Sequence, residues 1–331
     1  KLALEVTLTE GANISPDPAR VMDYSHPQKF TVTSEDGNWH KEYSVIIDTF
    51  DLPLRYDFEH YELNETGKYQ VFFEETQGTA LFKQYIWASG NSGFALTGVG
   101  RNPQEYPTVS IENGIDGSRA IKLETKSTGQ FGETVKMPIA AGNLFLGSFD
   151  VNNAVQKPLK ATRFGLPFGK KPLQLKGYYK YTPGTQPFKA KDKNGNTVTI
   201  PGQEDEGDIY AVLYEAAELD GQALDGNNVL TSKNIVALAR VEVEKKDEFT
   251  AFHVDFHYGS RIPIDWPEFI RDQRDPSDDG TGEYLSFSEE KMKNYEYNLA
   301  VVFTSSKYGA YFAGSVGSTL CIDKVEIVCE K

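Results

Sequence analysis

The chain has 331 residues, 39% of them hydrophobic, and carries a formal net charge of −14 with an isoelectric point near 4.9. An acidic chain is repelled by phosphate backbones and anionic membrane surfaces, so nucleic acid is excluded as an expected partner. No apolar run reaches transmembrane length, and the 29 glycines, 16 prolines, 18 tyrosines and 20 phenylalanines favour short strands joined by turns. We therefore expect an all-β protein.

The first 50 residues are expected to form a small domain. Three segments read as strands, residues 2–8, 28–33 and 40–48, with turn-type residues between them. An immunoglobulin-like sandwich needs about seven strands. Residues 1–50 are therefore either a minimal immunoglobulin-like β-sandwich or one that lacks its first strands, and we favour the second interpretation. Because the chain opens directly on a strand-like segment, we also expect a targeting segment or lipid anchor upstream of Lys1.

A larger domain is expected over residues 54–331. Its candidate strands alternate or run apolar at strand length, at residues 120–125, 144–149, 173–181, 208–214, 235–243, 249–258 and 297–303. With the carboxyl-terminal tail, they supply enough strands for two packed sheets, and their number fits a jelly roll.

The tail is expected to be the closing strand of that sandwich. Leu320 and Ile322 keep a two-residue period, as do Val325 and Ile327, but the count slips by one residue at 323–324. The slip predicts a β-bulge. The only two cysteines, at 321 and 329, lie eight residues apart on this strand, or about 26 Å, so they cannot bridge each other.

Several motifs occur in a particular order in this chain. They are Trp87–Gly93, Ala140–Gly147, Phe164–Phe168, Leu175–Tyr181, Asp208–Glu215 and the tail from Gly314. As a series they resemble the putative carbohydrate metabolism domain of secreted or lipid-anchored proteins from gut-dwelling Gram-negative bacteria. The resemblance covers roughly residues 54–331. It implies a jelly-roll domain similar to carbohydrate-binding modules, an upstream immunoglobulin-like domain, a cell-surface or secreted location, and glycan recognition or breakdown.

Glycan recognition needs flat aromatic faces together with amides and carboxylates that bond hydroxyl groups. Trp87 and Trp266 are the candidate platforms, and Asn91 lies close to Trp87 in the sequence. Trp87 has a core or loop-anchoring role as its alternative. Trp266 follows Asp265, whose spacing to Glu268 matches a capping box and predicts a short helix. That ring either anchors an acidic loop or exposes a stacking face.

Residues 252–258 alternate strictly between apolar and polar types. His253, Asp255 and His257 should therefore project from one face of a strand. The two histidines would lie about 13 Å apart and cannot share one ion. The trio is either a polar face that meets sugar or a plain solvent-facing strand.

An acidic cluster surrounds Gly280 and Gly282, and consists of Asp275, Asp278, Asp279 and Glu283. Carboxylates at this density could hold a hard cation, with calcium as the candidate. The alternative is a solvated surface loop. No other cofactor is expected.

The sequence gives weak support to catalysis. Glycoside hydrolysis needs two carboxyls about 5 to 10 Å apart, and the acidic run at residues 204–208 reads as a loop. Nucleophile and phosphate-binding motifs are missing. We expect a noncatalytic, monomeric protein that binds a polysaccharide or host glycan. The alternatives are a glycoside hydrolase on the same fold and a structural or adhesive surface protein.

Overall fold

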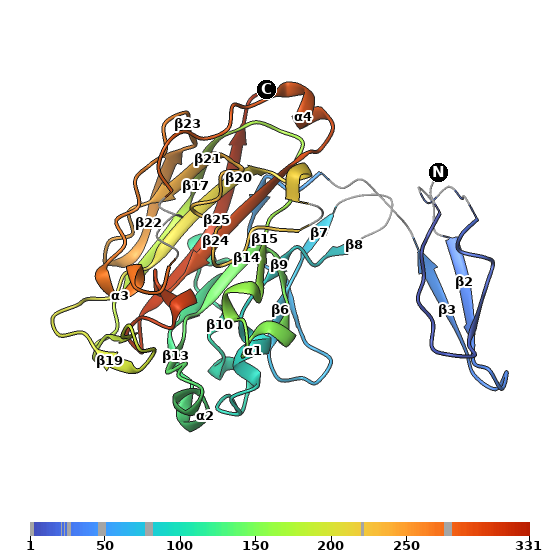
Figure 1. Ribbon diagram of the computed structural model, residues 1–331, viewed down its shortest axis with the longest axis horizontal. Coiled ribbons are helices and arrows are strands. Elements are labelled where there is room, and N and C mark those ends of the chain that lie inside the picture. The colour runs from blue at the N-terminus through green and yellow to red at the C-terminus, as the bar shows by residue number, and fades with distance from the viewer. Residues whose placement is uncertain are drawn as a thin grey trace. The chain divides into compact units, whose positions relative to one another are not determined.

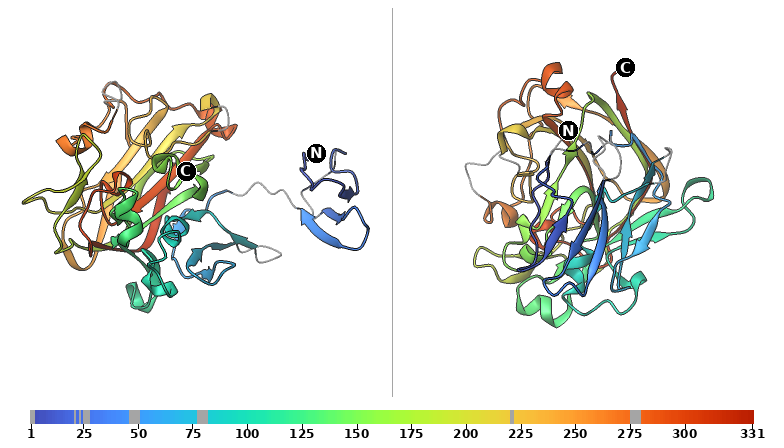
Figure 2. Two further views of the ribbon diagram at one scale, coloured as in Figure 1. Left: turned by 60° about the horizontal axis from the view of Figure 1, so that its bottom comes forward. Right: turned by 90° about the vertical axis from the view of Figure 1, so that its right-hand side faces the viewer.

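In the computed structural model the chain forms two compact units, residues 1–51 and 52–331 (Figure 1). The structure describes residues 3–20, 22, 24, 28–45, 51–76, 82–219, 222–274 and 280–331. Strands run through both units, and the described α-helices have six residues or fewer (Figure 2). The expected all-β class is confirmed. None of the described helices has the length and apolar character needed to cross a membrane.

The smaller unit contains one antiparallel sheet of three strands in the order β1-β2-β3. Their bounds are β1 Asn13–Ser15, β2 Gln28–Thr33 and β3 His40–Val45. The rings of Tyr24 and Phe30 are buried and stack at 6.3 Å, which gives the sheet its apolar contact. An immunoglobulin-like sandwich has about seven strands, so the described part of this unit holds fewer than half of them.

The three expected strands of this unit have different outcomes. The segment 28–33 is β2, and β3 covers the described part of segment 40–48, whose residues 46–48 lie outside the described residues. The strand predicted at 2–8 is wrong over its described residues 3–8. Leu4 N–H donates to Pro18 O at 2.9 Å, but among the described residues of this unit no neighbouring strand extends that bond into a ladder. Alternation of side chains makes a strand only where a partner strand pairs with it.

The larger unit contains two large antiparallel sheets. In the six-stranded sheet the order is β10-β11-β25-β17-β22, and β4 also pairs with β25. These strands are β4 Arg55–Tyr56, β10 Thr108–Ile111, β11 Ala120–Glu124, β17 Pro172–Thr182, β22 Lys246–Asp255 and β25 Thr319–Cys329.

The eight-stranded sheet has the order β15-β14-β24-β20-β21-β23, with β16 on β24 and β9 on β14. These strands are β9 Trp87–Ala88, β14 Asn143–Phe149, β15 Thr162–Phe164, β16 Leu166–Pro167, β20 Asp208–Glu215, β21 Ile235–Val241, β23 His257–Tyr258 and β24 Tyr297–Thr304. The chain passes from the six-stranded sheet into the eight-stranded sheet between β22 and β23.

The main core fills the space between the two sheets. Each strand sends alternate residues inward, such as Leu175 and Ile322 from the six-stranded sheet and Ala211 and Val301 from the eight-stranded sheet, all fully buried. Burial of apolar area at about 25 cal/mol per Å² makes this contact the main source of stability for the larger unit.

The closing strand has the predicted irregularity. Leu320, Ile322, Val325 and Ile327 are all buried, and the pairing of β25 with β17 shifts register between Lys176 and Tyr178. At Lys324 φ is +47°, in the left-handed region that non-glycine residues rarely adopt. The β-bulge predicted at residues 323–324 is therefore confirmed. Both cysteines on this strand are free.

Short hairpins and helices occupy the connections. The remaining strands are β5 Tyr61–Leu63, β6 Gln70–Phe72, β7 Glu74–Thr76, β8 Phe82–Gln84, β12 Lys126–Ser127, β13 Ile139–Ala140, β18 Lys189–Lys191 and β19 Thr197–Thr199. The α-helices are α1 Asn91–Ala95, α2 Gly129–Thr134, α3 Glu268–Arg271 and α4 Glu289–Lys293. The capping box predicted at Asp265 is wrong: Pro267 occupies the N-cap of α3, and no side chain caps it.

The outer face of the eight-stranded sheet carries a second apolar layer. Its members come from the alternate positions that point away from the main core, and include Phe145, Val212, Ala300 and Val302. Connections from other parts of the chain cover this face, because side chains such as Val229 and Tyr284 pack onto it. The sheet is thus buried on both faces, and the covering connections create the space described next.

Candidate functional site

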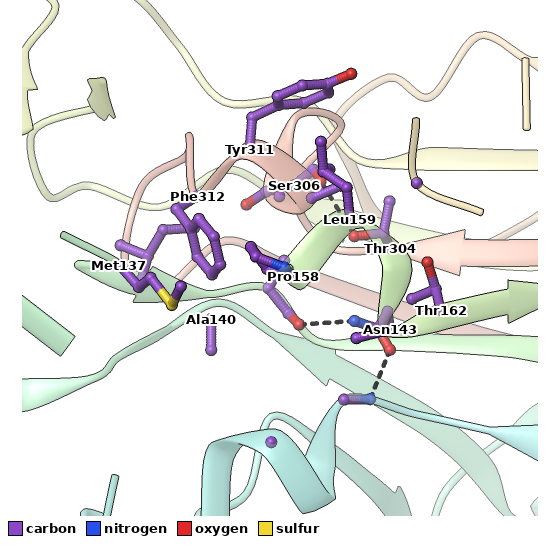
Figure 3. A pocket seen from close by; sticks show the side chains of 18 of the residues that line it. Met137, Ala140, Asn143, Pro158, Leu159, Thr162, Thr304, Ser306, Tyr311 and Phe312 are labelled. Carbon is purple, nitrogen blue, oxygen red and sulfur yellow. Dashed lines mark hydrogen bonds between the residues drawn. The ribbon is translucent and has the colours of Figure 1, made fainter. Parts of the chain in front are cut away.

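A cavity of about 200 Å³ lies on the outer face of the eight-stranded sheet. Four strands supply its floor: Phe145 from β14, Val302 from β24, Tyr210 from β20 and Arg240 from β21. These positions share a face because they alternate with main-core residues along each strand. Figure 3 shows the side chains around this space.

The walls of the cavity come from the connections that cover the sheet. They include Phe131 of α2. They also include Pro158 and Leu159 of a 3₁₀ turn, and Tyr311 and Phe312 after β24 (Figure 3). Phe312 adopts a φ of +57°, so the chain turns sharply where it leaves the 3₁₀ turn Gly309–Tyr311. Most of the lining is apolar.

Asn143 fixes one edge of the cavity. Its Oδ1 accepts from Gly90 N–H at 2.8 Å, and its Nδ2 donates to Ala141 O at 3.3 Å (Figure 3). The Thr108 hydroxyl donates to the backbone carbonyl of Asn143 at 2.7 Å. This side chain therefore holds the segment before α1 against β14 and has both amide atoms engaged.

Asp208 and Arg240 form a buried ion pair in the cavity lining. Arg240 Nε donates to Asp208 Oδ1 at 3.0 Å and Nη2 donates to Oδ2 at 2.7 Å. The two side chains are 18% and 4% exposed for Arg240 and Asp208, respectively. This two-point geometry is the strong form of a charge-assisted bond. Asp208 is consequently held as the partner of Arg240 rather than as a free acid.

Asp205 anchors the loop that carries the aromatic wall. Its Oδ2 accepts from the Ser306 hydroxyl at 2.6 Å and from Ser315 N–H and the Ser318 hydroxyl at 2.7 Å each. Burial raises the pKa of Asp205 to about 6, although these hydrogen bonds oppose the shift. The carboxyl joins the end of β24 to the start of β25 and thereby positions residues 308–312.

Trp266 lies in the cavity wall as a partly buried ring. The Arg274 guanidinium lies 4.1 Å from its ring centroid, and the rings of Tyr308 and Tyr311 lie 6.4 and 6.5 Å away. It packs with Phe269 and Ile270 of α3 in a separate apolar cluster. Of the two roles left open by the sequence, these contacts fit an anchor for the loop. Trp266 is nevertheless one of the residues that line the cavity.

Trp87 and Asn91 lie away from any open surface. Trp87 is 4% exposed in the main core, with Tyr56 at 5.0 Å, and its Nε1 donates to Glu74 Oε1 at 2.7 Å. Asn91 is fully buried and bonds both backbone groups of Thr108, at 3.1 and 2.8 Å. A ring without an open face cannot stack on a sugar, so the core role is the one this geometry supports for Trp87.

His253, Asp255 and His257 are exposed, and the residues that alternate with them, Phe252 and Phe256, are buried. The predicted alternation is therefore observed. Asp255 Oδ1 accepts from Gln174 Nε2 at 2.6 Å on the outer face of the six-stranded sheet. The trio is nevertheless divided between the two sheets: His253 and Asp255 lie on β22 of the six-stranded sheet, whereas His257 lies on β23 at the edge of the eight-stranded sheet. Neither β22 nor β23 contributes a residue to the lining of the cavity.

Of the predicted acidic cluster, only Glu283 lies among the described residues. Asp275, Asp278 and Asp279 lie outside the described residues, and Glu283 is exposed. Within the described ranges, no three histidine, cysteine or acidic side chains come together in an arrangement that would hold a metal ion.

Sequence reasoning did not identify the cavity residues Asn143, Asp208 and Arg240 as a site. A usable signal was present: Asp208 and Arg240 are charged residues at the ends of strands that are otherwise almost entirely apolar. Charged side chains are rarely buried without a partner. Their pairing, however, depends on the register of β20 with β21, which places Tyr210 opposite Arg240.

Two family models match the chain. One, described as putative carbohydrate metabolism domain, matches residues 57–328, and the other, described as SGBP, N-terminal, matches residues 1–47. No curated protein matches it.

Two solved structures are similar to the chain. A putative glycoside hydrolase from Bacteroides thetaiotaomicron VPI-5482 shares 42% identity with a TM-score of 0.76, over 98% of this chain and 85% of that one. A putative glycoside hydrolase from Bacteroides vulgatus ATCC 8482 shares 36% identity with a TM-score of 0.68, over 85% of this chain and 100% of that one. The resemblance stated from the ordered motifs is confirmed, and the chain belongs to the putative carbohydrate metabolism domain family.

Proposed function

We propose that this protein binds glycans at the cell surface and that its binding site is the cavity on the outer face of the eight-stranded sheet. The observation that carries the proposal is that several of the family motifs line the same cavity. Four of the motifs that carry the family resemblance contribute to one cavity: Gly90 and Gly93 from the first, Asn143 and Phe145 from the second, Phe164 from the third, and Asp208 and Tyr210 from a later one. Motifs far apart in sequence meet there.

The chemistry of the cavity suits part of a sugar chain. Its aromatic walls, which include Phe312 and Tyr311, offer contact area for the apolar side of a pyranose. Its volume of about 200 Å³ lies below the usual ~300–1,000 Å³ of ligand pockets. We infer that it takes one sugar unit or the end of a chain rather than a long stretch of polymer.

Binding without hydrolysis is the version we favour. Among the described residues that line the cavity, Asp208 is the one carboxylate, and Arg240 engages both of its oxygens. Hydrolysis by the usual route needs two carboxyls about 5 to 10 Å apart across the bond, one of which gives a proton. The descriptions of the two similar structures as glycoside hydrolases make hydrolysis at this cavity the second candidate.

The smaller unit and the net charge support the proposed location and class of partner. Residues 1–47 match a domain described as SGBP, which stands for surface glycan-binding protein, and this supports a place on the surface of a gut bacterium. A net charge of −14 favours a neutral polysaccharide over an acidic one.

A matched pair of variants tests the site. Ala310 is exposed and lines the cavity, whereas Ala251 is exposed on β22 of the other sheet. On an array of neutral glycans, Ala310→Trp should reduce the affinity for the glycans bound by wild type at least tenfold, because the larger ring occupies the opening. Ala251→Trp should leave it within twofold.

The opposite pattern, with binding lost only in Ala251→Trp, would place the site on the six-stranded sheet. If a folded wild-type protein bound no glycan, the proposed function itself would be wrong. A reducing-sugar assay on each bound glycan decides between the two candidates, since released sugar that Ala310→Trp abolishes would favour hydrolysis.

A further inference from the structure

Most polar side chains that line the cavity are engaged with the protein itself. Asn143 uses both amide atoms on backbone groups, and the hydroxyls of Thr128 and Thr304 each donate to a backbone carbonyl. Asp208 and Arg240 pair with each other. A bare hexose would bury several hydroxyls against this lining, and each buried hydroxyl without a partner weakens binding. The part of a ligand that enters the cavity should therefore be apolar.

Aromatic side chains border the cavity on its floor and on its walls. Phe145 and Phe164 meet edge to face on the sheet, with ring centroids 4.9 Å apart, and Phe312 lines the cavity from the connection after β24 (Figure 3). Met137 adds a thioether, a group that makes favourable contacts with aromatic rings. Aromatic rings attract one another in edge-to-face and offset arrangements. This lining therefore favours a flat aromatic ring over an aliphatic group of similar size.

The volume of the cavity suits one such ring. An apolar cavity of ~150 Å³ engineered into another protein stays dry and binds benzene. The cavity on the eight-stranded sheet has about 200 Å³. It can hold a six-membered aromatic ring together with the first atoms of a linkage.

The lining of the cavity reaches the surface of the protein. Phe131 is 41% exposed, and Asn227 and Ala310 are exposed as well. A ring that enters from the surface leaves an attached sugar outside, where the hydroxyls of the sugar keep their hydrogen bonds to water. The cavity can thus bind the substituent without burying the sugar.

Resting on the proposed function, we infer that the cavity binds an aromatic ring that the glycan carries. The ring is either the aglycone of a glycoside or the acyl part of an aromatic ester, because both join a flat apolar group to a sugar through a short linkage. It packs among Phe145, Phe312 and Met137. An aromatic side chain buries about 150–250 Å². Roughly 55 Å² of apolar area accounts for a tenfold change in affinity at ~25 cal/mol per Å².

The first experiment compares ligands that differ only in the substituent. Wild-type protein is measured by calorimetry against the phenyl, cyclohexyl and methyl β-glycosides of glucose, galactose and xylose, and against methoxybenzene, which carries the ring without a sugar. A second arm uses a hydroxycinnamoylated arabinoxylo-oligosaccharide before and after alkaline removal of the ester. We expect the aromatic member of each series that binds to bind at least tenfold more tightly than the methyl or de-esterified member. The arm that responds identifies the aglycone or the ester.

Each other outcome contradicts a different part of the inference. Equal binding of aromatic and unsubstituted members would overturn the aromatic inference and leave glycan binding intact. Equal binding of phenyl and cyclohexyl glycosides would overturn the preference for an aromatic ring. Methoxybenzene that bound as tightly as the phenyl glycosides would overturn the proposed function, because the sugar would then contribute nothing. Absence of binding to every glycan by folded protein would overturn the proposed function together with the inference.

The second experiment places the ring in the cavity. Met137→Gln makes one wall polar and keeps the length of the side chain, so the affinity for the phenyl glycoside should fall at least fivefold and that for the methyl glycoside by less than twofold. Met292→Gln is the matched control, at a half-buried methionine of α4 that packs against the main core, and should change neither value. Unchanged binding of the phenyl glycoside by Met137→Gln would overturn the placement of the ring, whereas the ligand comparison stands on wild-type protein alone.

Discussion

The two large sheets share one core but differ on their outer faces. The outer face of the eight-stranded sheet is covered, so that Phe145 and Val302 are buried there, and a cavity remains under the cover. The outer face of the six-stranded sheet is open and polar, with His253 and Asp255 exposed on it. A covered face can build a water-excluding site, and an open face can offer only a flat, solvated one.

The same contrast appears in the ion pairs. Asp208 is 4% exposed and bonds Arg240 at two points under the cover. Glu326 on the open face is 36% exposed, and its partner Arg55, at 3.3 Å, is 77% exposed. The connections that cover the eight-stranded sheet exclude solvent, which would otherwise screen charges. A buried charge there therefore depends on its partner far more than a charge on the open face does.

The largest expected effect comes from breaking the covered pair. Asp208→Asn leaves the Arg240 guanidinium buried without its counter-charge and should lower the free energy of unfolding by about 3–5 kcal/mol. Glu326→Gln, the matched change on the open face, should cost about 0–1 kcal/mol. Urea unfolding of both variants measures the difference. Equal losses would show that the cover does not isolate the cavity from solvent.

The double variant Asp208→Leu with Arg240→Met sharpens this result. Because both charges are then absent from the covered face, most of the stability lost in Asp208→Asn should return. Failure to recover would mean that the pair also organises the packing of the strands around it.

Much of the fold could be predicted because burial alternates along the strands. The phase change between Leu320–Ile322 and Val325–Ile327 was enough to place a bulge on β25. The strand at residues 2–8 failed for the complementary reason, since alternation does not show whether a partner strand is available. Local pattern therefore predicts strands well only where long-range pairing agrees with it.

The site could not be predicted in the same way. Asp208 and Arg240 are 32 residues apart and meet only through the register of two strands. The covering connections, such as residues 158–160 and 309–312, have no period that would reveal which face they cover. For the same reason the sequence could not decide whether Trp87 or Trp266 lies in the core.

A smaller effect is expected from a carboxyl that folding removes from solvent. Burial raises the pKa of Glu74 to about 7 from 4.5, against the hydrogen bond from Trp87. The folded protein therefore binds more protons than the unfolded chain between about pH 4.5 and 7, and stability falls as pH rises through that window. Asp205 acts in the same direction between about pH 3.8 and 6.

Glu74→Gln removes the charge and keeps an acceptor for Trp87. We expect this variant to be more stable than wild type at pH 8, by on the order of 1–2 kcal/mol, and the difference to disappear towards pH 5. Chemical unfolding at a series of pH values measures it. A variant that is less stable at pH 8 would show that the ionised carboxylate is stabilised by the fold rather than penalised.

The smallest effect is expected from the exposed side chains on β22 and β23. His253→Ser, Asp255→Ser and His257→Ser change exposed side chains, and of these Asp255 has one exposed hydrogen bond, to Gln174. Each change should alter the free energy of unfolding by less than about 0.5 kcal/mol, because solvated side chains on a strand lose little when shortened. The double variant of His253 and Asp255, which both lie on β22, also separates the two faces as sites. One of the two interpretations of the sequence pattern makes these polar residues a sugar-binding face, whereas the cavity proposal expects glycan affinity to persist within twofold. Loss of binding in a double variant of normal stability would therefore transfer the site from the covered face to the open one.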